Sequence, residues 1–130
     1  MRLLDSRPET VPSADVYRAG LVAVRDRMTE KQFRMLRYHF LARGASATQR
    51  QLSVEVGYAN YGGANLQYGI FAGKLADAMG VTVNGDLVFL LSTFLTEPDV
   101  AEGEIQLVMR GALISAIESL GWFSGEANEE

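Results

Sequence analysis

Few side chains in this sequence could do chemistry. It contains a single histidine, His39, and no cysteine. One imidazole cannot by itself form a histidine metal site or a catalytic relay, and without thiols neither disulfides nor thiolate metal sites can form. The Ser, Asp and Glu residues show no spacing that would pair a nucleophile with a base. We therefore expect no enzymatic activity, no metal and no cofactor.

A different kind of chemistry is suggested by residues 57–69, GYANYGGANLQYG, which are rich in Gly, Tyr and side-chain amides and carry no charge. Amides can bond bidentately to adenine edges, and tyrosines can reach phosphates or stack on bases. The candidate nucleic-acid contacts here are Asn60, Tyr61, Asn65, Gln67 and Tyr68. Asn65 has an alternative role as a helix cap or a brace of the turn.

Positive charge for such contacts would come mainly from the preceding residues. Residues 1–65 carry ten Lys/Arg against six Asp/Glu, whereas residues 66–130 carry two against ten. Nucleic-acid affinity depends strongly on phosphate contacts from basic side chains. The candidates are Arg34, Arg37, Arg43, Arg50 and Lys74, with a solvated helix surface as the alternative interpretation.

The acidic half favours a second hypothesis. Clustered carboxylates on a turn can mimic phosphates and bind a basic site on another protein. The candidate partner contacts are Asp86, Glu97, Asp99, Glu102 and Glu104. The alternative is that these residues only solvate a turn.

Four helices are predicted before and around these residues. Ser13 can cap a helix over residues 14–28, and Thr29 with Gln32 forms a capping box for a second helix ending at Gly44. Ser46 and Gln49 repeat that spacing for a short helix ending at Gly57. A further helix begins within residues 57–69, with Leu66, Ile70, Phe71, Leu75 and Met79 near helical period, and stops at Gly80. A short helix, a glycine turn and a longer helix are typical of a helix-turn-helix.

The period changes after Gly80. Residues 86–95 form an apolar, β-branched run, residues 96–104 an acidic turn, and residues 105–110 alternate, which predicts a β-hairpin. Residues 111–120 follow as a last helix, with Trp122 closing the fold. We predict a mainly α protein with a β-hairpin (α+β), a winged helix-turn-helix with an extra helix at each end.

This organisation predicts one domain over residues 13–123, between a flexible leader (residues 1–12) and a flexible acidic tail (residues 124–130). No apolar run is long enough to span a membrane, and the N-terminus lacks the apolar core of a signal peptide. A cytoplasmic protein is expected.

Gly69 and Gly73 lie four residues apart in the predicted third helix of the motif. Each costs about 1 kcal/mol relative to alanine in a helix, so a close contact must offset them. One interpretation is close packing against another element of this chain. The other is close approach of the backbone of a partner.

Residues 45–80 and the VMRGALISAIESLGW tail resemble a small bacterial and phage winged-helix-type domain found alone or beside HNH-type nuclease modules. The resemblance is carried by Gly57, Tyr58, Tyr61, Asn65, Leu66, Tyr68, Gly69, Gly73, Leu75, Ala76 and Gly80. It implies the fold. The histidine-rich metal-binding module of those nucleases is missing here, so cleavage activity is not carried over.

Two functions are therefore expected. The first is a nonenzymatic winged-helix protein that binds double-stranded DNA, as a regulator or an accessory of a restriction-type system. The second is a phage-encoded anti-defence (anti-CRISPR-like) inhibitor whose acidic half binds a nucleic-acid-binding protein complex. The apolar faces of the terminal helices could also form a homodimer, although burial within one chain explains them equally well.

Overall fold

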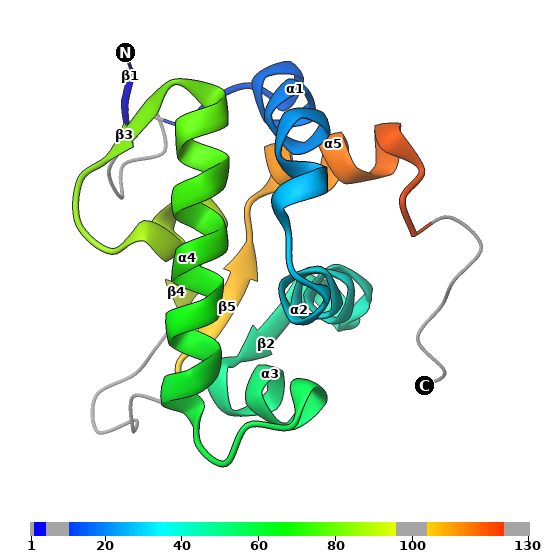
Figure 1. Cartoon of the computed structure of the whole chain (residues 1–130), viewed down its shortest axis with the longest axis vertical. Helices are drawn as coiled ribbons and strands as arrows, with labels where there is room; N and C mark the ends of the chain where they lie inside the picture. Colours follow the sequence, from blue (N-terminus) through cyan, green and yellow to red (C-terminus); the bar gives the residue numbers. More distant parts are fainter. Residues whose placement is uncertain (1, 5–10, 96–103, 124–130) are drawn as a thin grey trace.

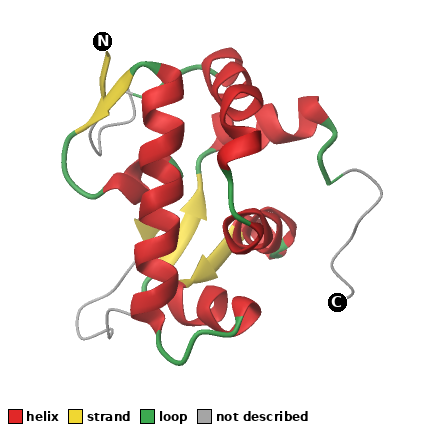
Figure 2. Cartoon of the chain, viewed as in Figure 1, coloured by secondary structure: helices red, strands yellow, loops and turns green. Residues whose placement is uncertain are grey.

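The computed structural model describes residues 2–4, 11–95 and 104–123. These residues form a mainly helical α+β domain with five α-helices and a small three-stranded antiparallel sheet (Figures 1 and 2). The α-helices are α1 (Ala14–Val24), α2 (Glu30–Leu41), α3 (Gln49–Val56), α4 (Tyr61–Met79) and α5 (Gly111–Leu120). The strands are β1 (Arg2–Leu4), β2 (Ser46–Thr48), β3 (Val81–Val83), β4 (Ser92–Leu95) and β5 (Gln106–Met109). Three short 3-10 turns, η2 (Arg25–Arg27), η3 (Arg43–Ala45) and η4 (Leu87–Leu90), join them.

The first two helices begin where the capping residues predict. The Ser13 hydroxyl accepts a hydrogen bond from the Val16 amide at the start of α1. Thr29 and Gln32 form a reciprocal capping box at α2, with both bonds 3.1 Å long. These bonds satisfy backbone amides that would otherwise have no partner inside the helix.

The predicted cap of α3 is wrong by two residues. The capping box is formed by Thr48 and Gln51, not by Ser46 and Gln49. Ser46 instead begins strand β2, which pairs antiparallel with β5 from Ser46↔Val108 to Thr48↔Gln106. Two similar capping patterns overlap in the sequence, and strand pairing selects the later one.

The helix predicted to begin within residues 57–69 is α4, the longest in the described chain. Asn60 caps it by accepting from the Gly62 amide at 2.9 Å. Gly57 and Gly80, both with positive φ, end α3 and α4 as predicted. The buried side of α4 differs from the predicted apolar stripe: Phe71 and Leu75 are buried, but Leu66 and Ile70 face solvent.

The segment after Gly80 is only partly the predicted hairpin. Strands β4 and β5 pair antiparallel, and the sheet order is β2-β5-β4. The first half of the predicted strand is η4, because the Asp86 side chain accepts from the Val88 amide at 2.9 Å and starts a helical turn. That turn buries Val88 and Leu90 in the core.

Strand β3 is not predicted from the sequence, and two segments of this region lie outside the described residues. Strand β3 pairs in parallel with β1, which falls in the predicted leader. The rest of the acidic turn, residues 96–103, and the C-terminal tail, residues 124–130, lie outside the described residues.

The core lies between α4, the two terminal helices and the sheet, with α4 crossing in front of β4 and β5 in Figure 1. Helix α1 packs on α4 at Gly20, where an added Cβ would lie 2.4 Å from Met79 Cγ. The close helix contact that we predicted for glycines of α4 is therefore made by a glycine of α1. Trp122 packs against Phe33 with ring centroids 5.7 Å apart, and the neighbouring Phe123 is almost fully buried.

Candidate functional site

The predicted arginine contacts lie on α2, η3 and α3, within residues 34–50. Arg34 Nη2 donates to the Glu55 carbonyl oxygen at 2.7 Å and lies 3.6 Å from the Glu55 carboxylate. Arg50 forms an ion pair with Glu104. Arg43 is exposed, and Arg37 is half-buried. The basic side chains lie close together along the chain, but Arg34 and Arg50 each lie next to a carboxylate.

The amide and tyrosine candidates lie along the N-terminal half of α4, and most of them make contacts within the chain. Asn60 is the helix cap. Asn65 Oδ1 accepts from Gln49 Nε2 at 2.8 Å, so it braces α4 against α3. Gln67 Oε1 accepts from Gln32 Nε2 at 3.3 Å. Tyr61 is half-buried at the first position of the helix.

Tyr68 and Lys74 do not fit a surface that contacts nucleic-acid bases. Tyr68 is fully buried, so the prediction that it touches a ligand is wrong. Lys74 Nζ donates to the Arg27 carbonyl oxygen at 2.7 Å and lies 3.4 Å from Gln32 Oε1. The one cation of α4 therefore ties the helix to the α1–α2 connection.

The buried partner of Tyr68 is His39. Its Nε2 lies 2.7 Å from the Leu107 carbonyl oxygen, and its Nδ1 lies 2.7 Å from the Tyr68 hydroxyl. A carbonyl can only accept, so Nε2 carries the proton and Nδ1 accepts from Tyr68. Burial lowers the pKa of His39 to about 4 and raises the pKa of Tyr68. Both ring nitrogens of the neutral imidazole serve to join α2, α4 and β5.

The described members of the acidic set also have structural roles. Asp86 caps η4, and Glu104 pairs with Arg50. Glu97, Asp99 and Glu102 lie outside the described residues. Of the five residues predicted to mimic phosphates, the structure therefore describes only Asp86 and Glu104.

The predicted glycine strip of α4 faces away from this chain. A Cβ added at Gly69 would have no neighbour within 4 Å, and one at Gly73 would only touch Leu87, at 3.5 Å. The interpretation that Gly69 allows close packing within the chain is therefore wrong. Close approach of a partner stays a prediction for this strip.

Gly69 and Gly73 instead lie along a surface groove of α4. Three adjoining hollows of about 210, 280 and 470 Å³ follow the helix, sharing Asn65 and Asp86 between the first two and Leu87 between the last two. We call this surface the α4 groove. Its α4 residues are Asn65, Leu66, Gly69, Ile70, Gly73, Ala76 and Asp77. Its other residues are the C-cap Gly80 and Gln49, Val81, Thr82, Val83, Asp86, Leu87, Phe94, Ile105 and Leu107.

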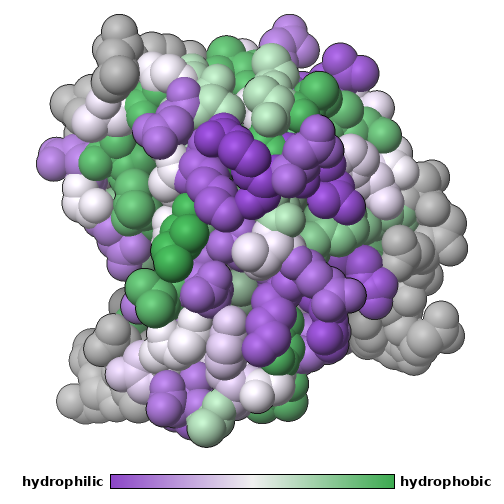
Figure 3. Space-filling model, viewed as in Figure 1, coloured by the Kyte–Doolittle hydropathy of each residue, from purple (hydrophilic) through white to green (hydrophobic). Residues whose placement is uncertain are grey.

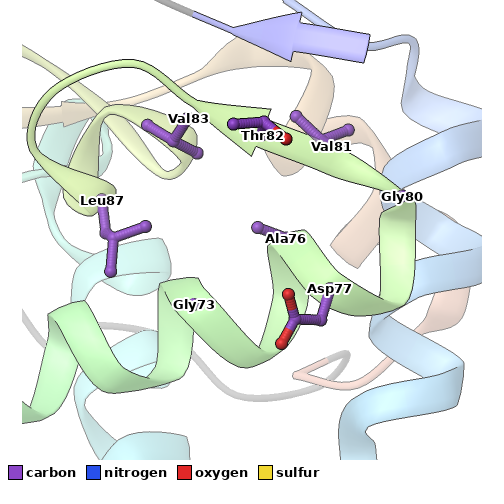
Figure 4. Close-up of a pocket in the computed structure, with 8 residues that line it drawn as sticks. All are labelled: Gly73, Ala76, Asp77, Gly80, Val81, Thr82, Val83 and Leu87. Atoms are coloured by element: carbon purple, nitrogen blue, oxygen red, sulfur yellow. The ribbon is translucent and has the colours of Figure 1, made fainter. Parts of the chain in front are cut away.

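The largest hollow separates the C-terminal half of α4 from β3 and η4 (Figure 4). Ala76 and Val83 face one another across it, with Leu87 at one end. The Asp77 carboxylate lies on the side of α4 away from β3. The walls of this hollow are thus mainly apolar, with a carboxylate at its edge.

Exposed apolar side chains dominate the middle of the groove. Leu66 is 61% exposed, and Ile70 and Leu87 are each 40% exposed. Figure 3 shows an apolar patch over the middle of α4, next to the hydrophilic surface that lies between α4 and α2. Among the described residues that line the groove, Asp77 and Asp86 carry charge and no Lys or Arg is present.

Sequence reasoning finds part of this site. The spacing of Gly69 and Gly73 points to it, whereas the apolar period assigns Leu66 and Ile70 to the core. The sequence does not predict Gln49 and Leu87 as residues of this site. The sequence does contain a signal that Leu66 and Ile70 are exposed. Apolar residues occupy two sides of this helix, and a helix at the surface buries only one side.

No family model, curated protein or solved structure matches this chain. The resemblance to the HNH-associated domain therefore stays a prediction. Within the described residues, no helix is long and apolar enough to cross a membrane. No group of three potential metal-ligating side chains occurs there either.

Proposed function

We propose that this protein is a nonenzymatic cytoplasmic winged-helix domain that binds another protein along the α4 groove. The order α2-β2-α3-α4-β4-β5, interrupted after α4 by β3 and η4, supports the winged-helix assignment together with the sheet order β2-β5-β4. In this assignment α4 is the helix that would otherwise read DNA, and α1 and α5 are additions at the two ends.

The observation that carries the proposal is the chemistry of the α4 groove. From Asn65 to Gly80 it follows about 22 Å of helix, at 1.5 Å per residue. Exposed apolar side chains line it, and its described lining residues include carboxylates but no cation. A DNA-reading helix needs the opposite charge, because phosphates repel carboxylates and are bound by Lys and Arg.

The same features specify the partner. An apolar face of a helix could bury Leu66, Ile70 and Leu87, and Gly69 would let its backbone approach α4 closely. Basic side chains flanking that face would complement Asp77 and Asp86. A second copy of this chain docked symmetrically would bring like charges together, which disfavours a homodimer through this groove.

A display library of helical peptides about 15 residues long tests this proposal. We expect selection on the wild-type protein to enrich peptides with an apolar face and basic flanks. An Ile70→Arg variant should bind them at least about tenfold more weakly, because the change fills the groove with a repelling charge. Val54→Arg is the matched control, since Val54 is 74% exposed on α3, outside the groove.

The proposal fails if no peptide distinguishes the wild-type protein from Ile70→Arg. It also fails if Val54→Arg weakens binding as much as Ile70→Arg. Sedimentation of the wild-type protein alone, which reports a second copy of the chain in the groove, is expected to give a monomer.

DNA binding through the arginines of α2, η3 and α3 is the second candidate. It is favoured by the placement of all four arginines within residues 34–50, on α2, η3 and the first helix of the helix-turn-helix, α3. If it is right, binding to mixed duplex DNA weakens as salt rises, and Arg43→Glu weakens it further while Ile70→Arg does not. A mobility shift measured at two salt concentrations checks this, and an absence of binding at the lower one contradicts it.

A further inference from the structure

One end of the α4 groove contains a buried hydrogen-bond acceptor without a partner. Gln49 is only 6% exposed, and its Nε2 donates to Asn65 Oδ1 at 2.8 Å. Its Oε1 has no hydrogen-bond partner among the described residues. Leaving such an atom unpaired costs about 1–3 kcal/mol, so the arrangement calls for an explanation.

This side chain lines the hollow of about 210 Å³, which we call the Gln49 pocket. Among the described residues, its walls are Phe94, Ile105 and Leu107, and its remaining polar residues are Asn65 and Asp86. Pockets for whole small-molecule ligands usually have volumes of about 300–1,000 Å³. The Gln49 pocket is smaller and suits the end of one side chain.

Asp86 supplies the charge at this pocket. One carboxylate oxygen caps η4 by accepting from the Val88 amide, which leaves the other oxygen for a ligand. Gln49 lies at the N-terminal end of α3, where the helix dipole is equivalent to about half a positive charge. This partial charge repels a cation less than the full negative charge of Asp86 attracts it. The neighbouring Arg50 is paired with Glu104, which offsets its charge.

The ligand must therefore donate hydrogen bonds, carry positive charge and fit between apolar walls. A guanidinium meets all three conditions, because it has five donors and no acceptor, is weakly hydrated and stacks on aromatic rings such as Phe94. An ammonium is more strongly hydrated and loses more on entering such a pocket. We propose that the Gln49 pocket binds the guanidinium of an arginine side chain.

The arginine would be presented by the protein that docks in the α4 groove, and in this respect the inference rests on the proposed function. The pocket adjoins the middle hollow of the groove through Asn65 and Asp86. A docked helix would therefore insert the arginine at one end while its apolar face covers Leu66 and Ile70.

The direct test uses N-acetyl-arginine methylamide as the probe and follows the side-chain amide signals of Gln49 and Asn65 by NMR. We expect saturable shifts of these signals with the arginine probe. The citrulline analogue, which has nearly the same shape but no charge, should leave them unchanged, and the lysine analogue should bind more weakly. No shift with the arginine probe, or equal shifts with the citrulline analogue, would overturn the proposal.

Two variants separate binding from folding. Asp86→Asn keeps the capping oxygen but replaces the free carboxylate oxygen with an NH2 group, which cannot accept from a guanidinium. It should weaken arginine binding at least about tenfold, since a charge-assisted hydrogen bond is lost. Gln49→Met removes the unpaired acceptor together with the hydrogen bond to Asn65, so it should abolish the arginine-dependent shift of Asn65. The loss of thermal stability should be small, because removal of the unpaired acceptor offsets loss of that bond. Unchanged binding in either variant contradicts the assigned pocket.

The outcome is independent of the peptide selection. Groove-dependent peptides that show no preference for arginine would retain the proposed function and overturn only the pocket. Binding of the arginine probe without any selected peptide would retain the pocket and overturn the proposed function.

Discussion

Acidification from pH 7 to pH 4 is expected to lower the free energy of unfolding by about 3 kcal/mol more in the wild-type protein than in a His39→Gln variant. The pKa of His39 is lowered from an ordinary value of 6.5 to about 4 by burial. Between these two values the unfolded chain binds a proton that the folded protein excludes. The stabilising contribution is therefore complete above pH 6.5 and is lost as the pH falls through the folded pKa.

Glutamine is the appropriate replacement because its amide can donate to the Leu107 carbonyl and accept from Tyr68 but does not titrate near these pH values. Urea unfolding at a series of pH values, followed by fluorescence of Trp122, the only tryptophan, measures the difference. Surface carboxylates titrate in both proteins and cancel in the comparison. Parallel stability curves would show that His39 is accessible to protons in the folded state.

Replacement of Tyr68 by Phe is expected to cost about 1–3 kcal/mol of stability, although Tyr68 and Phe differ by one oxygen atom. The hydroxyl is the donor to His39 Nδ1 at 2.7 Å, and both residues are fully buried. Without it, the imidazole nitrogen is buried with no donor. Thermal or chemical unfolding of the variant measures the loss.

Tyr61→Phe is the matched control within the same helix. Tyr61 is half-buried at the start of α4, so removal of its hydroxyl should change stability by less than about 0.5 kcal/mol. Equal effects of the two substitutions would contradict the distinction between a core tyrosine and a surface tyrosine. They would also reopen Tyr68 as a ligand contact.

The position of Tyr68 explains why the expected DNA-reading surface differs from the α4 groove. The sequence pattern predicts tyrosines, amides and Lys74 on one outward surface. In the fold, Tyr68 turns inward to His39, Lys74 reaches the α1–α2 connection, and Leu66 and Ile70 turn outward. The outward surface of α4 is consequently apolar and acidic, which supports binding of a protein more than binding of DNA.

The two proposals assign different roles to the middle of the groove and to one of its ends. The apolar middle around Leu66 and Ile70 would contribute area and therefore affinity. The Gln49 pocket would contribute selectivity, because a partner without arginine would leave the Gln49 acceptor unpaired. A partner selected on both features is a helix with an apolar face and an arginine near one end.

Local signals in the sequence determine where most helices begin and end. Ser13 and the Thr29–Gln32 pair cap helices through bonds that span three residues, and Gly57 and Gly80 end helices through backbone conformations that favour glycine. Such interactions depend on neighbours along the chain, so they can be recognised whatever the fold. The absence of cysteine and the single histidine likewise limit the chemistry through composition alone.

Tertiary structure decides which of several equally good local choices is used. Pairing of β2 with β5 moves the α3 cap from Ser46 to Thr48, and burial of Val88 and Leu90 turns half of a predicted strand into η4. Helix α4 has apolar residues on two sides, and contact with α1, α3 and η4 determines that Tyr68 and Phe71 are buried while Leu66 and Ile70 remain exposed. The α4 groove is formed by residues far apart in the chain, so the physical cause of the candidate site is long-range packing that local periodicity does not encode.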